Sequence, residues 1–265
     1  MKKIIFILLL IAISVWLSVF SVDDNLKIIA CDVGQGDAIL IQRKTTQILI
    51  DGGPNSSVLN CLGKYMPFWD RELELVINTH PELDHYAGLI DVFKNYKVNY
   101  FGTNGSTSSS RSYKVLESLV GGSLTTQLLL TKGVVIKADM IHLDILNPEV
   151  VNEYKETNNN GVVVILKYND FKAIFTADVE NEVSDKLSNL EIIKGLDYIK
   201  VNHHGSRNGM SEKLLKQVNP KLAVISSGKR NSYGHPHAEI LQILKKYEIK
   251  ILRTDEVGDV VLKIN

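Results

Sequence analysis

Cysteine is scarce in this sequence. The 265 residues contain two cysteines, Cys31 and Cys61, and no C-x-x-C pair. This scarcity excludes a metal site built from thiolates. A disulfide between the two cysteines is open to a protein in an oxidising compartment, but a chain of this size does not need one to stabilise its core. We therefore expect two buried free thiols.

The sequence also lacks an excess of charge of either sign. Lys plus Arg and Asp plus Glu both total 30. No strong electrostatic field is therefore available to gather nucleic acid or anionic lipid over the whole surface, although a local basic patch stays open. Internal repeats and a disordered composition are absent as well. With 45% hydrophobic residues, the chain can build one sizeable domain.

The first twenty residues differ sharply from the rest. Lys2 and Lys3 precede an apolar run from Ile4 to Phe20 that is interrupted by two serines. This pattern predicts a signal peptide or an N-terminal membrane anchor over residues 1–21, with both lysines on the cytoplasmic side. Ser21 offers a weak cleavage site, so cleavage and retention stay equally open. In either case we expect a secreted or membrane-anchored protein that faces the extracytoplasmic side; a buried N-terminal helix is the alternative.

The remainder of the chain predicts two strand-rich halves, each followed by helices. Alternating or β-branched runs indicate strands at 26–30, 38–41, 47–50, 73–77, 134–136, 141–146, 161–168, 171–176, 198–202, 222–225, 251–253 and 259–264. Helical spacing indicates helices at 56–66, 86–95, 182–187, 211–218 and 238–247, and a Gly/Ser/Thr-rich loop spans 102–112. This order predicts an α/β fold with stacked sheets and helices outside.

The sharpest local pattern is the loop Thr79-His80-Pro81-Glu82-Leu83-Asp84-His85, which directly follows a predicted buried strand. Imidazole nitrogen and carboxylate oxygen are ordinary ligands of zinc, manganese and iron, so two histidines and two acids in one loop indicate a metal site. The alternative is a helix N-terminus at which Asp84 is the cap and the histidines face solvent.

Three further groups of polar residues also lie just past apolar strands. Asp178, the pair His203 and His204, and the pair His235 and His237 each follow such a strand. One histidine or aspartate at a strand end is usually structural, but the shared context predicts that these loops converge on one site.

A set of motifs in a fixed order resembles the metallo-β-lactamase-fold hydrolases. These motifs are Asp32-Val33-Gly34-Gln35-Gly36-Asp37, Ile50-Asp51-Gly52-Gly53, His80-x-Glu82-x-Asp84-His85, Thr176-Ala177-Asp178, His203-His204-Gly205-Ser206 and Tyr233-Gly234-His235-Pro236. They look in particular like the soluble hydrolase domain of the competence proteins that form the DNA-uptake channel. The resemblance implies a four-layer αββα sandwich over residues 26–265, which holds one or two divalent metal ions, zinc or manganese.

The resemblance also implies roles for individual residues. The implied metal ligands are His80, Glu82, Asp84, His85, Asp178 and His204, with His80 at a first metal, Asp84 and His85 at a second, and Asp178 between them. The implied catalytic residues are Asp84, His203 and His235. His203 and His204 are interchangeable at this stage, and His235 is expected on the substrate side as proton donor or additional ligand. Asp51 and Asn160 are expected to orient the ligands from behind.

Some positions depart from the pattern of the family. Glu82 stands where many members have histidine and the competence branch has aspartate, which brings occupancy of the first metal position into question. Asn159 and Asn160 stand where other branches place a further histidine. The turn with Gly34 and Gly36 lacks the third glycine of a dinucleotide-binding loop and leads into a strand, so we interpret it as structural.

Three functions follow from these residues. The first is an extracytoplasmic metal-dependent phosphodiesterase or nuclease that acts through metal-activated water, with DNA as a candidate substrate and a link to DNA uptake. The second is a hydrolase of cell-envelope phosphodiesters or other small esters. The third is a non-catalytic metal-binding accessory module. The N-terminal segment adds a membrane partner if it is retained.

Overall fold

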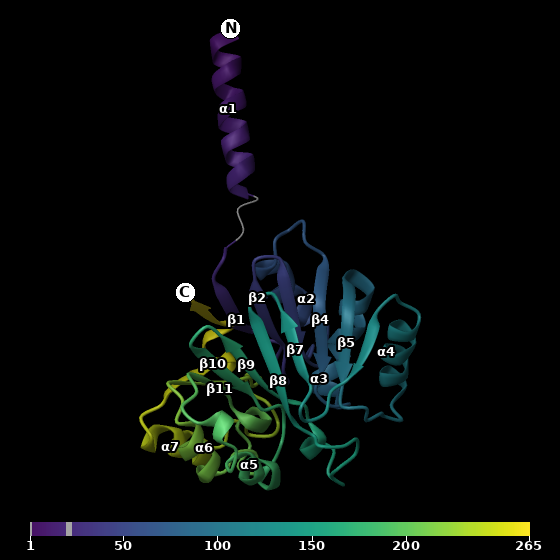
Figure 1. Ribbon diagram of the computed structural model, residues 1–265, viewed down its shortest axis with the longest axis vertical. Helices are drawn as coiled ribbons and strands as arrows, with labels where there is room; N and C mark the ends of the chain where they lie inside the picture. The colour runs from purple at the N-terminus through teal and green to yellow at the C-terminus, as the bar shows by residue number, and fades with distance from the viewer. Residues whose placement is uncertain (1, 20–22) are drawn as a thin grey trace.

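The computed structural model describes residues 2–19 and 23–265. Helix α1, Lys2–Val19, projects away from the body of the molecule and exposes its apolar side chains (Figure 1). Among the described residues, no helix has both the length and the apolar character needed to cross a membrane. The weak cleavage site at Ser21 lies outside the described residues, and the signal or anchor over 1–21 stays a prediction.

Two seven-stranded sheets form the centre of the protein. The first sheet has the order β14-β1-β2-β3-β4-β5-β6, with bounds Val260–Ile264, Leu26–Ala30, Ile39–Arg43, Thr46–Ile50, Glu72–Asn78, Lys97–Thr103 and Thr126–Leu129. The second sheet has the order β13-β12-β11-β10-β9-β8-β7, with bounds Lys250–Arg253, Leu222–Ile225, Tyr198–Lys200, Phe171–Phe175, Val163–Tyr168, Ile141–Asn147 and Val135–Ala138. Each sheet mixes antiparallel meanders with parallel pairs such as β3–β4 and β10–β11.

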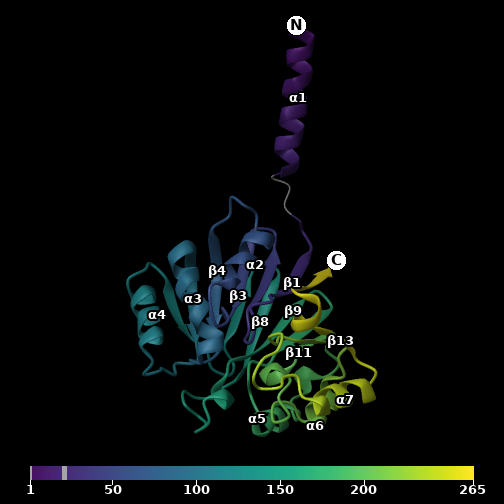
Figure 2. The same ribbon diagram turned by 180° about the vertical axis from the view of Figure 1, so that it is seen from behind.

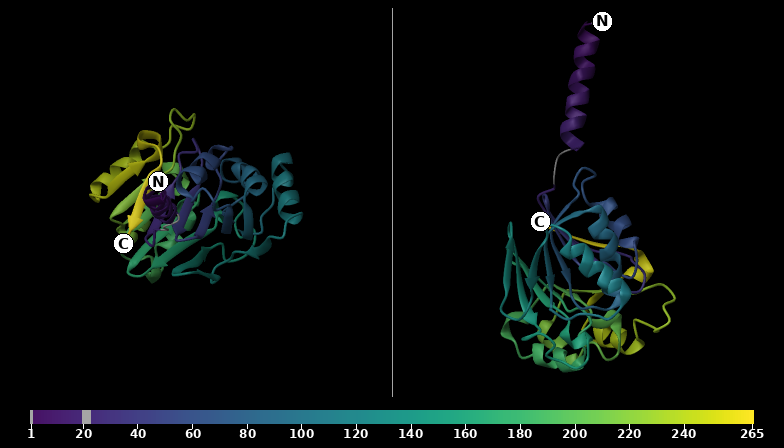
Figure 3. Two further views of the ribbon diagram at one scale, coloured as in Figure 1. Left: turned by 90° about the horizontal axis from the view of Figure 1, so that it is seen from above. Right: turned by 90° about the vertical axis from the view of Figure 1, so that its right-hand side faces the viewer.

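Helices cover the outer face of each sheet. The helices after α1 are α2 Ser57–Tyr65, α3 Leu83–Asn95, α4 Arg111–Gly121, α5 Asn181–Leu187, α6 Glu212–Val218, α7 Ala238–Lys246 and α8 Thr254–Val257. Figure 2 shows α2, α3 and α4 against the first sheet, whereas α5, α6 and α7 lie on the far side of the second sheet. Figure 3 shows the two sheets face to face between these helices.

Alternating side chains on each strand produce these layers. In β4, Leu75 and Ile77 point into the core between the sheets, whereas Val76 packs against the helices of the first sheet. In β10, Phe175 faces the core between the sheets and Ile174 faces α5 and α6. Because successive side chains of a strand point to opposite faces, each central strand buries both of its faces. The predicted four-layer αββα sandwich is confirmed.

The segment after α3 differs from the prediction. The predicted loop over 102–112 overlaps the end of β5 and the start of α4, and neither the helix α4 nor the edge strand β6 was assigned from the sequence. Tyr113, Leu116 and Val120 form the buried stripe of α4. Their spacing is helical. The helix was not predicted, because a Ser/Thr-rich stretch precedes Arg111 and two glycines end the helix, and both features are typical of loops.

The expectation of free thiols is wrong. Cys31 follows β1 and Cys61 lies in α2, and the two form a disulfide with their Cα atoms 5.9 Å apart. The pairing depends on α2 packing across the end of β1, which is a tertiary contact that the cysteine count does not reveal.

Candidate metal centre

Loops from both sheets meet at one edge of the sandwich. Asp51 follows β3, His80 follows β4, and Asp84 and His85 lie in the first turn of α3. From the second sheet, Asp178 follows β10. Parallel strands end at the same edge, so these residues from distant parts of the chain come together there as predicted.

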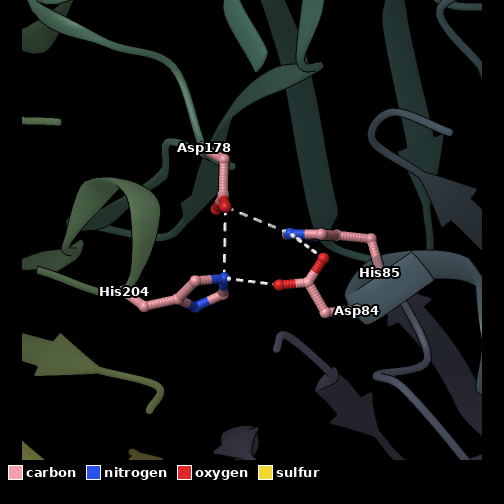
Figure 4. Close-up of side chains that lie close together, drawn as sticks. All are labelled: Asp84, His85, Asp178 and His204. Atoms are coloured by element: carbon pink, nitrogen blue, oxygen red, sulfur yellow. Dashed lines mark ion pairs between the residues drawn. The ribbon is translucent and has the colours of Figure 1, made fainter. Parts of the chain in front are cut away.

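Four of these side chains form a compact ligand group, which consists of Asp84, His85, Asp178 and His204. One ligand atom from each lies within 4.8 Å of the others. Asp178 Oδ2 is 3.3 Å from His85 Nε2 and 3.1 Å from His204 Nε2, and Asp84 Oδ2 is 3.3 Å from His204 Nε2 (Figure 4). Two imidazoles and two carboxylates at this spacing fit a divalent zinc or manganese ion.

Hydrogen bonds on the far side of each ring orient the two histidines of the ligand group. His204 Nδ1 lies 2.9 Å from the carbonyl oxygen of Ser226, which can only accept, so Nδ1 carries the proton. His85 Nδ1 lies 2.8 Å from Asp51 Oδ2 and donates to that carboxylate. In the neutral form of both rings the lone pair is therefore on Nε2, and both Nε2 atoms are buried without a hydrogen-bond partner among the described residues. Histidines that bind a metal through one ring nitrogen usually donate a hydrogen bond from the other, as both of these rings do.

His80 is oriented in the same way through Thr79. The Thr79 hydroxyl donates its proton to Asp51 Oδ2 at 2.8 Å and therefore accepts from His80 Nδ1 at 2.9 Å. The ring of His80 is fully buried, with its centroid 4.1 Å from that of His85. Burial, reinforced by the neighbouring His85, lowers the pKa of His80 to about 3, so this ring is neutral and its Nε2 lone pair is available as a ligand.

The acids and bases of the ligand group shift one another's pKa values in opposite directions. Burial disfavours the charged form of His85, but the carboxylates of Asp178 and Asp51 outweigh it and raise the pKa of His85 well above its ordinary value. His204 responds in the same way to Asp178 and Asp37. Burial opposes ionisation of Asp178, yet His204 and His85 hold its pKa well below the usual range. The site thus concentrates negative charge that attracts a cation, and without one the two histidines hold protons.

The backbone at the site is unusual. Asp51, Ala177, His203 and His204 all have a positive φ, between 46° and 59°. Side chains other than glycine rarely adopt this left-handed conformation, and its cost is typically tolerated where function requires a particular direction of the side chain. In the loop after β11, these angles turn His204 inward toward the ligand group.

Two of the predicted ligands lie outside the ligand group, and Asn160, which was expected to support the ligands, bonds elsewhere. His80 and Glu82 are not among the residues whose ligand atoms lie within 4.8 Å of one another. Burial, together with the charges of Asp84 and Asp178, raises the pKa of Glu82. The side-chain amide of Asn160 bonds to the backbone of Tyr154 and Glu156, so it holds its own loop.

His203 and His235 lie beside the ligand group, and both are partly exposed to solvent. His203 Nε2 is 3.7 Å from Asp178 Oδ2, farther than His204 Nε2, so the geometry favours His204 as the ligand. The ring of His235 is half-buried, with its centroid 5.6 Å from that of His203. Burial, followed by the charges of His204 and His203, lowers the pKa of His235 to about 4. Both rings can therefore contact a substrate bound at the ligand group.

Two charged residues at the site were not predicted to act there. Asp37 belongs to the Gly34–Gly36 turn, and Lys200 lies in β11. Both are buried, and they form an ion pair. A lysine inside an otherwise apolar run, Tyr198 to Val201, is the pattern that could have indicated this pair from the sequence.

The fold and the site together define a metal-dependent hydrolase-like domain. The profile of the Metallo-beta-lactamase superfamily matches residues 31–229. The chain therefore belongs to this superfamily. Among solved structures, the metallo-beta-lactamase fold protein YhfI from Bacillus subtilis aligns with a TM-score of 0.63 and 13% identity, over 91% of this chain and 100% of that protein. At this identity, the likeness shows the fold.

The curated relatives include Competence protein ComA of Neisseria gonorrhoeae, which is 25% identical over 239 residues that cover 86% of this chain and 30% of that protein. ComE operon protein 3 of Bacillus subtilis is 29% identical over 248 residues, which cover 86% of this chain and 32% of that protein. Recombination protein 2 of Haemophilus influenzae is 28% identical over 235 residues, which cover 86% of this chain and 28% of the relative. The chain thus spans about a third of the length of these relatives.

Proposed function

We propose that this protein is an extracytoplasmic, metal-dependent phosphodiesterase, with nucleic acid as its substrate. One observation carries the proposal: Asp84, His85, Asp178 and His204 place four ligand atoms within 4.8 Å of one another. A divalent ion held there supplies a Lewis acid that makes water nucleophilic near neutral pH and polarises a phosphoryl oxygen. Zinc and manganese both suit this mixture of imidazole and carboxylate.

The chain's own residues supply the other steps. Asp84 is ionised, because the hydrogen bond to His204 and the charge of His85 outweigh its burial and hold its pKa below the usual range. Its carboxylate can therefore accept a hydrogen bond from an attacking water and orient it. The partly exposed rings of His235 and His203 lie beside the ligand group and would contact the phosphoryl group and the leaving oxygen.

Exposed basic residues support a phosphate-bearing substrate. Arg207 follows the His203–His204 turn, and Lys229 and Arg230 lie on the loop between β12 and α7, which also carries His235. These cations would attract the backbone of a nucleic acid although the whole chain has no net charge. The names of the relatives, which refer to competence and recombination, favour DNA among such substrates.

Two features support the extracytoplasmic location. The N-terminal run that follows Lys2 and Lys3 resembles an export signal or an anchor. The Cys31–Cys61 disulfide suits an oxidising compartment. Protease protection of intact cells and spheroplasts tests this location; a chain that stays protected in spheroplasts contradicts it.

The activity is tested with the purified full-length chain loaded with Mn²⁺ or Zn²⁺. We expect chelator-sensitive cleavage of bis(p-nitrophenyl) phosphate and of DNA, and slower cleavage of a carboxyl ester. Asp178→Ala and His85→Ala should lose both metal and cleavage, whereas the control His142→Ala, an exposed histidine of β8, should keep both. Metal binding without cleavage of any phosphodiester would contradict the proposed phosphodiesterase activity and favour a non-catalytic accessory module.

A further inference from the structure

Strand β11 carries a lysine whose charged side chain lies inside the protein. Lys200 is 0% exposed and points to the same face of the strand as Tyr198, which belongs to the core between the sheets. A lysine is almost never fully buried unless an acid compensates its charge. The partners of Lys200 therefore decide what this residue does.

Two carboxylates surround the ammonium group. Lys200 forms an ion pair with Asp37 Oδ2, and its Nζ lies 3.8 Å from Asp178 Oδ1. Asp37 precedes β2 of the first sheet, whereas Lys200 lies in β11 and Asp178 follows β10 of the second sheet. The pair thus joins the two halves of the sandwich directly behind the ligand group.

Asp37 contacts two further members of the ligand group. Its backbone N–H donates to the carbonyl oxygen of Asp84 at 3.1 Å. Its Oδ1 lies 3.4 Å from Nδ1 of His204. Lys200 and Asp37 together therefore touch Asp84, Asp178 and His204, which are three of the four residues of the ligand group.

We propose that Lys200 and Asp37 are positioning residues, a buried ion pair that holds the metal ligands in their binding geometry. The inference rests on the proposed metal-dependent function. Asp178 has two oxygens, of which Oδ1 faces the ammonium of Lys200 and Oδ2 faces the Nε2 atoms of His85 and His204. The ammonium keeps Oδ1 away from the metal position and fixes the direction of Oδ2. Asp37 holds the backbone of Asp84 through its N–H group and contacts the ring of His204 through its carboxylate.

The pair is tested with the double variant Lys200→Met, Asp37→Asn in the full-length chain. This change removes one positive and one negative charge, so the net charge around the metal ligands is the same as in the wild type. A change in metal affinity then reports how the ligands are positioned. Tyr198→Phe, on the same face of the same strand, is the matched control. We expect the affinity for Mn²⁺ or Zn²⁺, measured by competition with a chelator, to fall roughly ten-fold in the double variant. The control should bind like the wild type.

A double variant that unfolds cooperatively yet binds metal with wild-type affinity overturns the inference. If the double variant does not fold, Asp37→Asn alone decides, with Co²⁺ as the probe. In this variant the ammonium is left with Asp178 as its neighbouring carboxylate, so the absorption spectrum of the bound Co²⁺ should change; an unchanged spectrum overturns the inference. These experiments measure metal binding and do not measure cleavage. A wild-type protein that binds metal but cleaves no phosphodiester would therefore contradict the proposed function and leave the positioning role of Lys200 and Asp37 intact.

Discussion

Asp51 Oδ2 lies 2.8 Å from Nδ1 of His85, and both side chains are buried. The same carboxylate accepts hydrogen bonds from the backbone and the hydroxyl of Thr79, which in turn holds His80. Asp51 therefore orients two histidines of the site without being a member of the ligand group. The resemblance to the metallo-β-lactamase-fold hydrolases implied this supporting role for it.

The first prediction concerns this carboxylate. Asp51→Asn replaces an acceptor-only group by an amide that cannot satisfy both Thr79 and His85. We expect metal affinity to fall by roughly 10- to 100-fold, because outer partners of metal-binding histidines contribute that much. Titration with a chelator measures it. Asp70→Asn, at a buried carboxylate that bonds to Gln47 and Glu72, is the control; equal affinities in the two variants would contradict the role.

The second prediction concerns Gly36. A Cβ atom added there would lie 2.2 Å from the backbone oxygen of Asp84, and the φ of Gly36 is +139°. Gly36→Ala should displace the first turn of α3 and lose most of the bound metal. Gly34→Ala is the matched control, because Gly34 has a positive φ but no atom within 4 Å of the added Cβ. It should cost about 1–2 kcal/mol of stability from backbone strain and keep its metal. Elemental analysis of both variants decides.

The third prediction concerns pH. The pKa values of His85 and His204 lie well above 6.5 in the metal-free protein. Their ion pairs therefore stabilise the metal-free fold at pH below 6.5, and this contribution is lost as the pH rises through the raised values. A metal needs both rings neutral, so binding at pH 7 should release more than one proton and affinity should rise with pH. Calorimetry in buffers of different ionisation enthalpy counts the protons; a count of zero would refute the assignment.

The fourth prediction concerns the Cys31–Cys61 disulfide, which bridges a sequence separation of 30 residues. Closing a loop of this length restricts the unfolded chain by about 3–4 kcal/mol. Reduction, or the variant Cys31→Ala, Cys61→Ala, should lower the free energy of unfolding by about this amount while the metal centre keeps its affinity, because neither cysteine touches the ligand group. Urea denaturation with and without reductant measures the difference. No change in midpoint would mean that the bond is not formed in solution.

The fifth prediction separates catalysis from metal binding. His235→Ala should lower phosphodiester cleavage by roughly 100-fold and leave the metal content unchanged, because this ring lies beside the ligand group without belonging to it. Steady-state kinetics and elemental analysis are measured on the same sample. Loss of metal in this variant would make His235 a ligand instead.

Local sequence patterns and the family motifs were sufficient to predict the layers of the fold and the loops that carry the site. Strands such as β1 and β12 were predicted to the residue, because both are short, β-branched or aliphatic runs bounded by turn residues. The shared position after apolar strands predicted His85, Asp178 and the pair His203 and His204 as one site, whereas the resemblance to the metallo-β-lactamase-fold hydrolases implied the role of Asp51.

Contacts between segments that are distant along the chain became apparent in the folded protein. The disulfide joins the end of β1 to α2, and Lys200 contacts Asp37 across the two sheets. The helix α4 follows a polar stretch and buries its apolar stripe. Likewise, His204 rather than His203 turns inward because of backbone angles that its residue type does not favour. Local patterns report which side of a strand is buried, whereas the partner of a buried charge or sulfur depends on packing between elements that are remote in sequence.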